Sequence, residues 1–242
     1  MIVTPPRRRK RADAQNNRER ILAAAREVFA DRGPDAPLEL IAERAGVGIA
    51  TLYRHFVNRS TLIRMVLLDL ADRLTLVIDA AAAEQADPFD ALTRVMREAV
   101  RLRIGAVTPT LVTSLAGDPE IVAVRAGVID RLEGLLAAAQ DAGSLRPDIG
   151  FGDVFLPLIR LGRPLPRPLR ELVGEALVER ELEVVLAGLR ARPDSPPCPL
   201  SAVPLAAADL RRALAAHGYP ASPDPNPDAA AVSASDRATT SP

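Results

Sequence analysis

The sequence has almost none of the residues from which metal and redox centres are usually built. It contains one cysteine, Cys198, two histidines and no tryptophan in 242 residues. A single cysteine excludes an internal disulfide and a cysteine-rich zinc site. His55 and His217 lie far apart in the sequence, with no cluster of ligands around either, so we expect neither a metal nor a cofactor. Because GxSxG, HExxH and phosphate-binding glycine motifs are also missing, we expect no enzyme.

Long apolar runs and aromatic residues are also scarce. No stretch of about eighteen uncharged apolar residues is present, so we expect no membrane span. Residues 1–20 hold a basic cluster without the apolar segment of a secretory signal, and we expect a cytoplasmic protein. Alanine, leucine and arginine dominate, which favours helix nearly throughout. With 48% hydrophobic residues, the chain can bury a sizeable core, and the sequence predicts an all-α fold.

What the sequence does contain is a helix, glycine turn and helix between Leu40 and Phe56. Small and apolar residues recur at helical spacing up to Ala45. Gly46 supplies the left-handed residue that ends a helix at low cost, and a second helix is expected over about Ile49–His55. A helix, a tight glycine turn and a second helix form the helix-turn-helix unit, which places its second helix in the DNA major groove. Leu52 and Phe56 should face inward, which would leave the other side of the second helix available to base edges and phosphates. The residues expected to contact DNA are Ile49, Ala50, Thr51, Tyr53, Arg54 and His55.

The string IAERAGVGIATLYRHF and its continuation to Leu62 resemble the tetracycline-repressor (TetR) family of transcription regulators, whose pattern is close to IAxxAGVSxxTLYxHFxxKxxL. The resemblance covers about Ile21 to Leu67. It implies an N-terminal three-helix helix-turn-helix head, a helical regulatory body and a two-fold dimer. Two positions depart from the pattern. Gly48 stands where a serine or threonine usually caps the recognition helix, and Arg59 replaces the commoner lysine, although either residue can hold a DNA phosphate.

Charge is distributed unevenly although the net charge is zero. Residues 1–65 hold 13 Lys+Arg against 7 Asp+Glu, and the remainder holds 18 against 24. A basic end on an acidic body suits a protein that brings one end to DNA. A predicted non-helical arm, residues 1–14, contains the densest basic run: Arg7, Arg8, Arg9, Lys10 and Arg11. A solvated tail is one interpretation, but the position before a helix-turn-helix favours an arm along DNA phosphates or a narrow minor groove.

The chain divides into four predicted segments: the arm 1–14, the helix-turn-helix domain 15–58, a ligand-binding and dimerisation domain 59–190, and a tail 191–242. A long amphipathic helix, Arg59–Ala80, should connect head and body. Ten prolines among the last 52 residues predict disorder, with a short helix over about Leu205–Ala216 as a possible exception. The other expected helices are Ala14–Arg32, Phe89–Arg103, Gly105–Gly117 broken at Pro109, Asp118–Ala142, Asp153–Leu161 kinked at Pro157, and Leu169–Arg190, with Gly162–Pro168 non-helical.

The resemblance also implies an effector cavity and a dimer interface in the body. The interface would be formed by Leu169–Arg190 and the preceding short helix, packed about a two-fold axis, in a region that prolines interrupt. An inward-facing arginine would favour an anionic effector. Candidate wall residues, for each of which a surface position is equally compatible, are Arg101, Thr108, Thr110, Thr113, Ser114 and Arg160.

The favoured hypothesis is a homodimeric regulator, most often a repressor in this family, that binds a pseudo-palindromic operator in double-stranded DNA and is released by a small-molecule effector. The alternative within DNA binding is a sequence-indifferent architectural protein without effector control. Such a protein would spread basic residues over its surface, whereas here they are concentrated at one end. An enzyme would need a convergent set of titratable groups, and none is evident.

Overall fold

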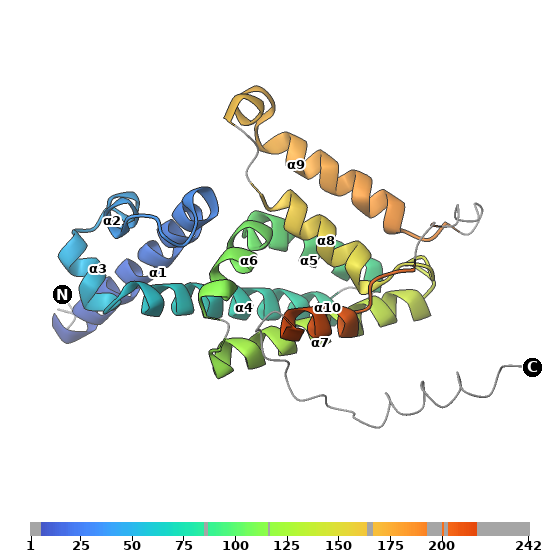
Figure 1. Cartoon of the computed structure of the whole chain (residues 1–242), viewed down its shortest axis with the longest axis horizontal. Helices are drawn as coiled ribbons and strands as arrows, with labels where there is room; N and C mark the ends of the chain where they lie inside the picture. Colours follow the sequence, from blue (N-terminus) through green and yellow to red (C-terminus); the bar gives the residue numbers. More distant parts are fainter. Residues whose placement is uncertain are drawn as a thin grey trace, which may run out of the picture.

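The computed structural model describes residues 6–84, 87–115, 117–163, 167–192, 200 and 203–216. Within these ranges the chain forms helices without a β-sheet, which confirms the predicted all-α class (Figure 1). None of the described helices is long and apolar enough to cross a membrane. The helices are α1 (Pro6–Arg32), α2 (Leu38–Ala45), α3 (Ile49–His55), α4 (Arg59–Glu84), α5 (Pro88–Arg101), α6 (Ile104–Ser114), α7 (Pro119–Asp141), α8 (Phe151–Leu161), α9 (Arg167–Leu189) and α10 (Ala207–Ala216).

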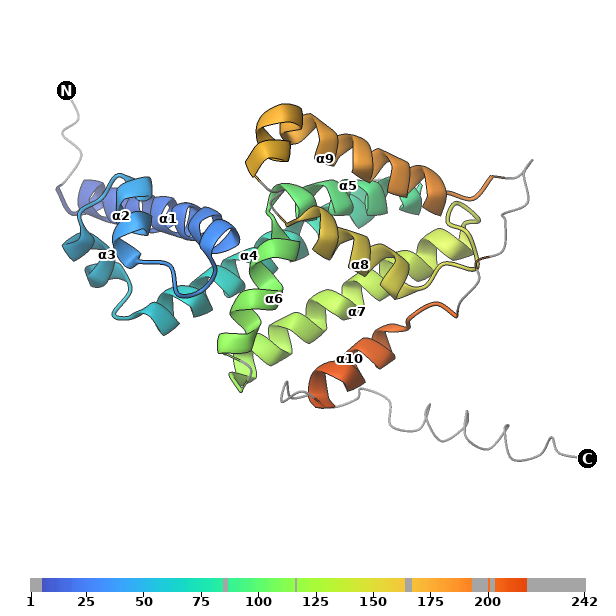
Figure 2. The same cartoon turned by 45° about the horizontal axis from the view of Figure 1, so that its top comes forward.

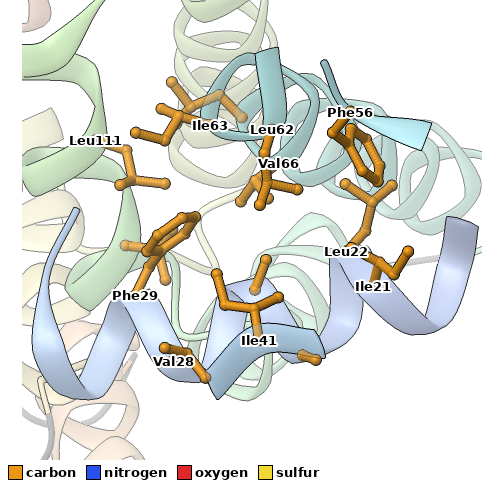
Figure 3. Packing of buried hydrophobic residues seen from close by; sticks show 14 of the residues in the cluster. Ile21, Leu22, Val28, Phe29, Ile41, Phe56, Leu62, Ile63, Val66 and Leu111 are labelled. Atoms are coloured by element: carbon orange, nitrogen blue, oxygen red, sulfur yellow. The ribbon is translucent and has the colours of Figure 1, made fainter. Parts of the chain in front are cut away.

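The first three helices and the start of α4 form the head, which lies at one end of the molecule (Figure 1). Its core is the apolar stripe of α1 packed on α2 and on the first turns of α4. In Figure 3, Ile21 and Phe29 of α1 lie near Ile41 of α2 and Val66 of α4, and all four are buried. Leu111 of α6 belongs to the same apolar cluster. The head is therefore packed directly against the body.

Helix α4 is the element shared by the head and the body. It begins after Asn58, whose side-chain oxygen accepts the Thr61 amide at 2.8 Å and so caps the helix. Apolar residues such as Leu62 and Val66 then enter the head core, while Leu74 and Ile78 enter the body core. Figure 1 shows α4 running from the recognition region through the middle of the body. The predicted connecting helix is confirmed and extends four residues further, to Glu84.

The remaining helices surround the far part of α4 and form the body. Helices α5, α6 and α7 pack against α4, and α8 packs on α5 and α6. Helix α9 lies on the outer side of α5 and α8, whereas α10 lies along α7 on a different side of the body (Figure 2). The predicted short helix in the proline-rich tail is thus confirmed as α10. Residues 217–242 of the predicted disordered tail lie outside the described part of the chain.

The helix break predicted at Pro109 is wrong, whereas the helix predicted around Pro157 is present. Helix α6 continues through Pro109 and α8 through Pro157, because buried residues on both sides of each proline, such as Val107 and Leu111, hold the segment against its neighbours. Tertiary packing here outweighs the missing backbone hydrogen bond. The predicted non-helical arm is also wrong from Pro6 onward. A proline is compatible with the first helical turn, and α1 starts there.

Candidate functional site: an exposed recognition helix and an apolar cavity

The turn between α2 and α3 has the glycine geometry that the sequence predicted. Gly46 adopts φ 63° and ψ 38°, in the left-handed region, where a residue with a side chain is disfavoured. The Gly46 amide donates to the Glu43 carbonyl at 2.9 Å, and the Val47 amide donates to the Ala42 carbonyl at 3.0 Å. Backbone hydrogen bonds therefore satisfy carbonyls in the last turn of α2. At the start of α3, Gly48 provides no side-chain cap, as its lack of a side chain requires.

Helix α3 presents the predicted face to solvent. Leu52 and Phe56 are fully buried and fix the crossing of α3 on the head core. Tyr53 is 47% exposed, and Ala50 and Arg54 are also exposed. The other predicted contact residues are half-buried, and they are Ile49, Thr51 and His55. Ile49 packs against the head core, so it supports α3 in addition to lying at the edge of the exposed face.

Arg54 is held along the surface of α3 by its own helix. Its Nε donates to the Ala50 carbonyl at 3.3 Å, and its Nη2 donates to Thr51 Oγ1 at 3.0 Å. Both partners are among the predicted DNA-contacting residues. The hydroxyl and guanidinium therefore lie together on the exposed face, on the same helix as the tyrosine ring. This small group offers donors of the kind that reach phosphates and base acceptors in a major groove.

The structure gives Arg59, which was predicted to contact a DNA phosphate, a contact inside the head. Its Nη1 donates to the carbonyl oxygens of Pro34 and Ala36 at 2.7 and 2.6 Å. These carbonyls belong to the loop between α1 and α2, so Arg59 ties the start of α4 to the entrance of the helix-turn-helix. Its placement was missed because a motif position does not reveal which carbonyls a nearby loop exposes.

The basic run Arg7–Arg11 lies in the first turns of α1, and the side chains of this run lie outside the described part of the structure. Two later arginines of α1 reach the recognition region. The guanidinium of Arg18 lies 5.3 Å from the centre of the Phe56 ring, and Arg20 Nη2 donates to the Gly46 carbonyl at 3.4 Å. The end of the head that carries α3 therefore also carries positive charge.

A cavity of about 130 Å³ lies inside the body between α4, α5, α6, α7, α8 and α10. Its walls are almost wholly apolar, with Leu67, Leu70 and Leu74 on the α4 side. The polar side chains that line it are those of Thr108 and Arg125. A concave, mostly apolar space with few polar groups is typical of a small-molecule site.

Only Thr108 of the six predicted wall residues lies at this cavity. Four others are exposed: Thr110, Thr113, Ser114 and Arg160. Arg101 is also exposed, and it pairs with Glu98 at 2.7 Å. The sequence reasoning missed Arg125, although a signal was present. Arg125 falls four residues from both Ile121 and Ile129, which places all three on one face of α7, and all three line the cavity.

Three arginines connect the helices around the cavity to one another and to the head. Arg103, which has φ 53°, lies directly before the cavity residues of α6. Its Nη1 donates to Asp31 Oδ1 of α1 at 3.1 Å. Arg26 of α1 pairs with Asp69 of α4. Arg64 of α4 pairs with Asp118 at 2.8 Å and with Glu120, at the start of α7. These ion pairs join α6 to α1, α1 to α4, and α4 to the start of α7.

The surroundings of Asp118 favour its ionised carboxylate. Partial burial raises the pKa of its carboxyl, but the hydrogen bonds from Arg64 and from the Ile121 amide, together with the charge of Arg64, outweigh this effect. The pKa of Asp118 therefore lies below its ordinary value, and the carboxylate stays ionised while it caps α7.

Helix α9, which was predicted to form the dimer interface, also packs on its own body. Its residues Leu182, Leu186 and Leu189 are buried in the body core, so they are not available to a second subunit. The side chains of residues 167–175 lie outside the described part. The described outward apolar residues of this region are Val184 on α9, 66% exposed, and Leu156 on α8, 39% exposed.

Comparisons with known proteins agree with this architecture. Residues 21–66 match the family model of bacterial regulatory proteins of the tetR family, and residues 87–191 match that of the SbtR-like transcriptional regulator C-terminal domain. The crystal structure of the TetR transcriptional regulator SCO0520 from Streptomyces coelicolor is 34% identical, covers 72% of this chain and 98% of its own, and has a TM-score of 0.54.

Two further relatives define the extent of the likeness. The ketosteroid transcriptional regulator KstR2 of Mycobacterium tuberculosis, at 22% identity and TM-score 0.52, shares the fold over 72% of this chain and 95% of its own. The regulator UidR of Escherichia coli K12 is 37% identical over 62 residues, which are 25% of this chain and 32% of UidR. The chain thus matches about a third of that curated relative.

An exposed recognition helix joined by one long helix to a body with a cavity defines a DNA-binding transcription regulator. The chain belongs to the TetR family.

Proposed function

We propose that this TetR-family regulator binds a pseudo-palindromic operator as a homodimer, represses transcription there, and releases the DNA when a small effector enters the body cavity. The observation that carries the proposal is that α4 belongs to both cores: it packs beside the recognition unit at one end and lines the cavity further along. The fold-related regulator LfrR from Mycobacterium smegmatis was crystallised in complex with proflavine, which supports ligand binding by such a body.

The effector that suits the cavity is small and mainly apolar. The cavity volume is about 130 Å³, and Thr108 and Arg125 are its polar side chains. The Thr108 hydroxyl can donate or accept a hydrogen bond. We therefore propose an effector with an apolar frame and one hydrogen-bonding group. Its binding would move α6 and α7, which are linked to α1 and α4 through the arginine ion pairs described above.

The proposed DNA contact of Tyr53 can be tested by removing one oxygen. Tyr53→Phe should weaken operator binding by about 1–2 kcal/mol, the scale of a hydrogen bond to a charged acceptor. Thermal stability should hardly change, because the ring is 47% exposed. Fluorescence anisotropy with an operator duplex measures the weakening, and Tyr219→Phe, which alters the other tyrosine, is the matched control. An unchanged DNA affinity would show that the Tyr53 hydroxyl does not contact the operator.

The basic run of α1 should act on all DNA sequences alike. Replacing its five cations, Arg7–Arg11, with glutamine keeps good helix formers and removes only charge. Affinity should fall equally for the operator and for a scrambled duplex, because phosphate contacts do not read bases. The slope of log affinity against log salt should become less negative by about 0.9 for each phosphate that the run no longer neutralises. An unchanged slope would show that the run does not touch DNA.

The proposed dimer should depend on the outward apolar residues of α8 and α9. Changing Leu156 and Val184 together to aspartate should give folded monomers, because neither side chain belongs to the body core. Leu76 of α4 is 69% exposed, and Leu76→Asp is the control that should stay dimeric. Sedimentation equilibrium with circular dichroism measures both variants. A dimer that survives the double change would place the interface elsewhere.

A further inference from the structure

Helix α10 forms part of the cavity wall although it lies beyond the region that matches the C-terminal family model, residues 87–191. Figure 2 shows α10 beside α7, separated in the chain from the rest of the body. Leu210 of α10 lines the cavity. Ala207, one turn earlier, is 1% exposed and belongs to the body core. The C-terminal segment therefore supplies part of the wall of a cavity that is otherwise lined by α4 to α8.

One arginine fastens α10 to α7. Arg211 Nη2 donates to Asp130 Oδ1 at 2.5 Å and to Glu133 Oε2 at 2.8 Å. Both carboxylates lie on α7, so the guanidinium bridges the two helices beside Leu210. The next residue makes no such bridge: Arg212 pairs with Asp209 inside α10 itself. Because adjacent arginines have different partners, the attachment can be tested with two alanine variants of identical composition, one at Arg211 and one at Arg212.

The residues just before α10 lie unusually close to the start of α8. The Gly152 amide donates to the Leu205 carbonyl at 2.9 Å. A Cβ added at Gly152 would lie 2.6 Å from Leu205 Cβ, and one at Gly150 would collide with Pro204. Because real Cβ atoms do not approach so closely, the two glycines are what permits the segment to lie against α8.

We propose that residues 204–216 are a lid over the effector cavity, and that Leu210 is the residue that limits the size of the effector. This inference rests on the proposed function only in taking the cavity as the effector site. The helices that form the other walls contribute many buried residues to the two cores. The described contacts of the lid are fewer: a few apolar residues, the Arg211 bridge and a backbone hydrogen bond. Segments with few buried contacts open at the lowest free-energy cost. Ligands therefore enter beneath α10, and those larger than the closed cavity bind only with the lid displaced.

Thiol labelling tests the lid directly. In a Cys198→Ala background, Ala99→Cys places a thiol in the cavity wall at a position that is 3% exposed. Iodoacetamide should react slowly with it while the lid is closed. Arg211→Ala and Leu210→Ala should each accelerate the reaction at least about tenfold, since local opening governs access to buried groups. Arg212→Ala should leave the rate within about twofold, because Arg212 does not bridge to α7.

A second thiol separates lid opening from general loosening of the fold. Ala25→Cys, fully buried in the head core, should react at the same rate with and without Arg211→Ala. Equal acceleration at residues 25 and 99 in both lid variants would overturn the proposal, as would an unchanged rate at residue 99. Labelling needs neither DNA nor effector. A failure to find an operator or a releasing ligand would count against the proposed function and leave the lid result standing.

Discussion

Operator DNA is expected to weaken effector binding by the same factor, about one hundredfold, by which the effector weakens operator binding. Thermodynamic linkage requires this equality if one conformational equilibrium serves both sites. A hundredfold weakening corresponds to a preference of about 2.7 kcal/mol for the state that does not match DNA, within the usual range of coupling energies. Calorimetric titration of effector with and without a saturating operator measures the factor, and a scrambled duplex is the control. Equal effector affinity in both titrations would contradict ligand control.

The geometry of α4 explains how so modest a preference can act on DNA. In a two-fold dimer the recognition helices must stand roughly 34–36 Å apart to enter successive major grooves. Helix α4 has 26 residues, and at about 1.5 Å per residue a small tilt moves its head end by several ångströms. On the proposed mechanism, an effector beside Ile104 and Gly105 would push on α6, and Arg103 would carry that displacement to Asp31 of α1.

The Gly105→Ala substitution is expected to lower the free energy of unfolding by about 1–3 kcal/mol. A Cβ there would lie 2.5 Å from Ile159 Cα and would collide with the Leu158 carbonyl. These are backbone atoms of α8, so the two helices would have to separate. The drop should appear despite the gain of about 1 kcal/mol that alanine gives over glycine in a helix.

Gly134→Ala is the matched control for that substitution. Gly134 lies inside α7, and a Cβ at this position meets nothing within 4 Å. The control should therefore raise the free energy of unfolding by up to about 1 kcal/mol, the helix-propensity gain alone. Urea unfolding of both variants measures the two changes. If both alanines stabilise the protein, the close crossing of α6 and α8 at Gly105 is not a constraint on the fold.

The recognition unit could be predicted closely because its signals are local. Gly46 marks the turn by its backbone conformation, and the spacing of Leu52 and Phe56 reveals which side of α3 is buried. The cavity could not be located in the same way. Of the polar residues in the apolar segment α6, only Thr108 lines the cavity, because facing depends on how α6 crosses α8. The glycines that permit α10 to cover the body carry no sign of their partner in the sequence.

The central claim, a dimeric and sequence-specific operator reader, is tested most directly by selecting bound duplexes from random DNA with the full chain. The account predicts a pseudo-palindromic consensus whose two half-sites are centred about one helical turn, or a multiple of it, apart. Tyr53→Phe should lower the affinity for that consensus more than the affinity for a scrambled duplex. Enrichment of no sequence, or of one without two-fold symmetry, would contradict the account and favour a sequence-indifferent DNA-binding protein.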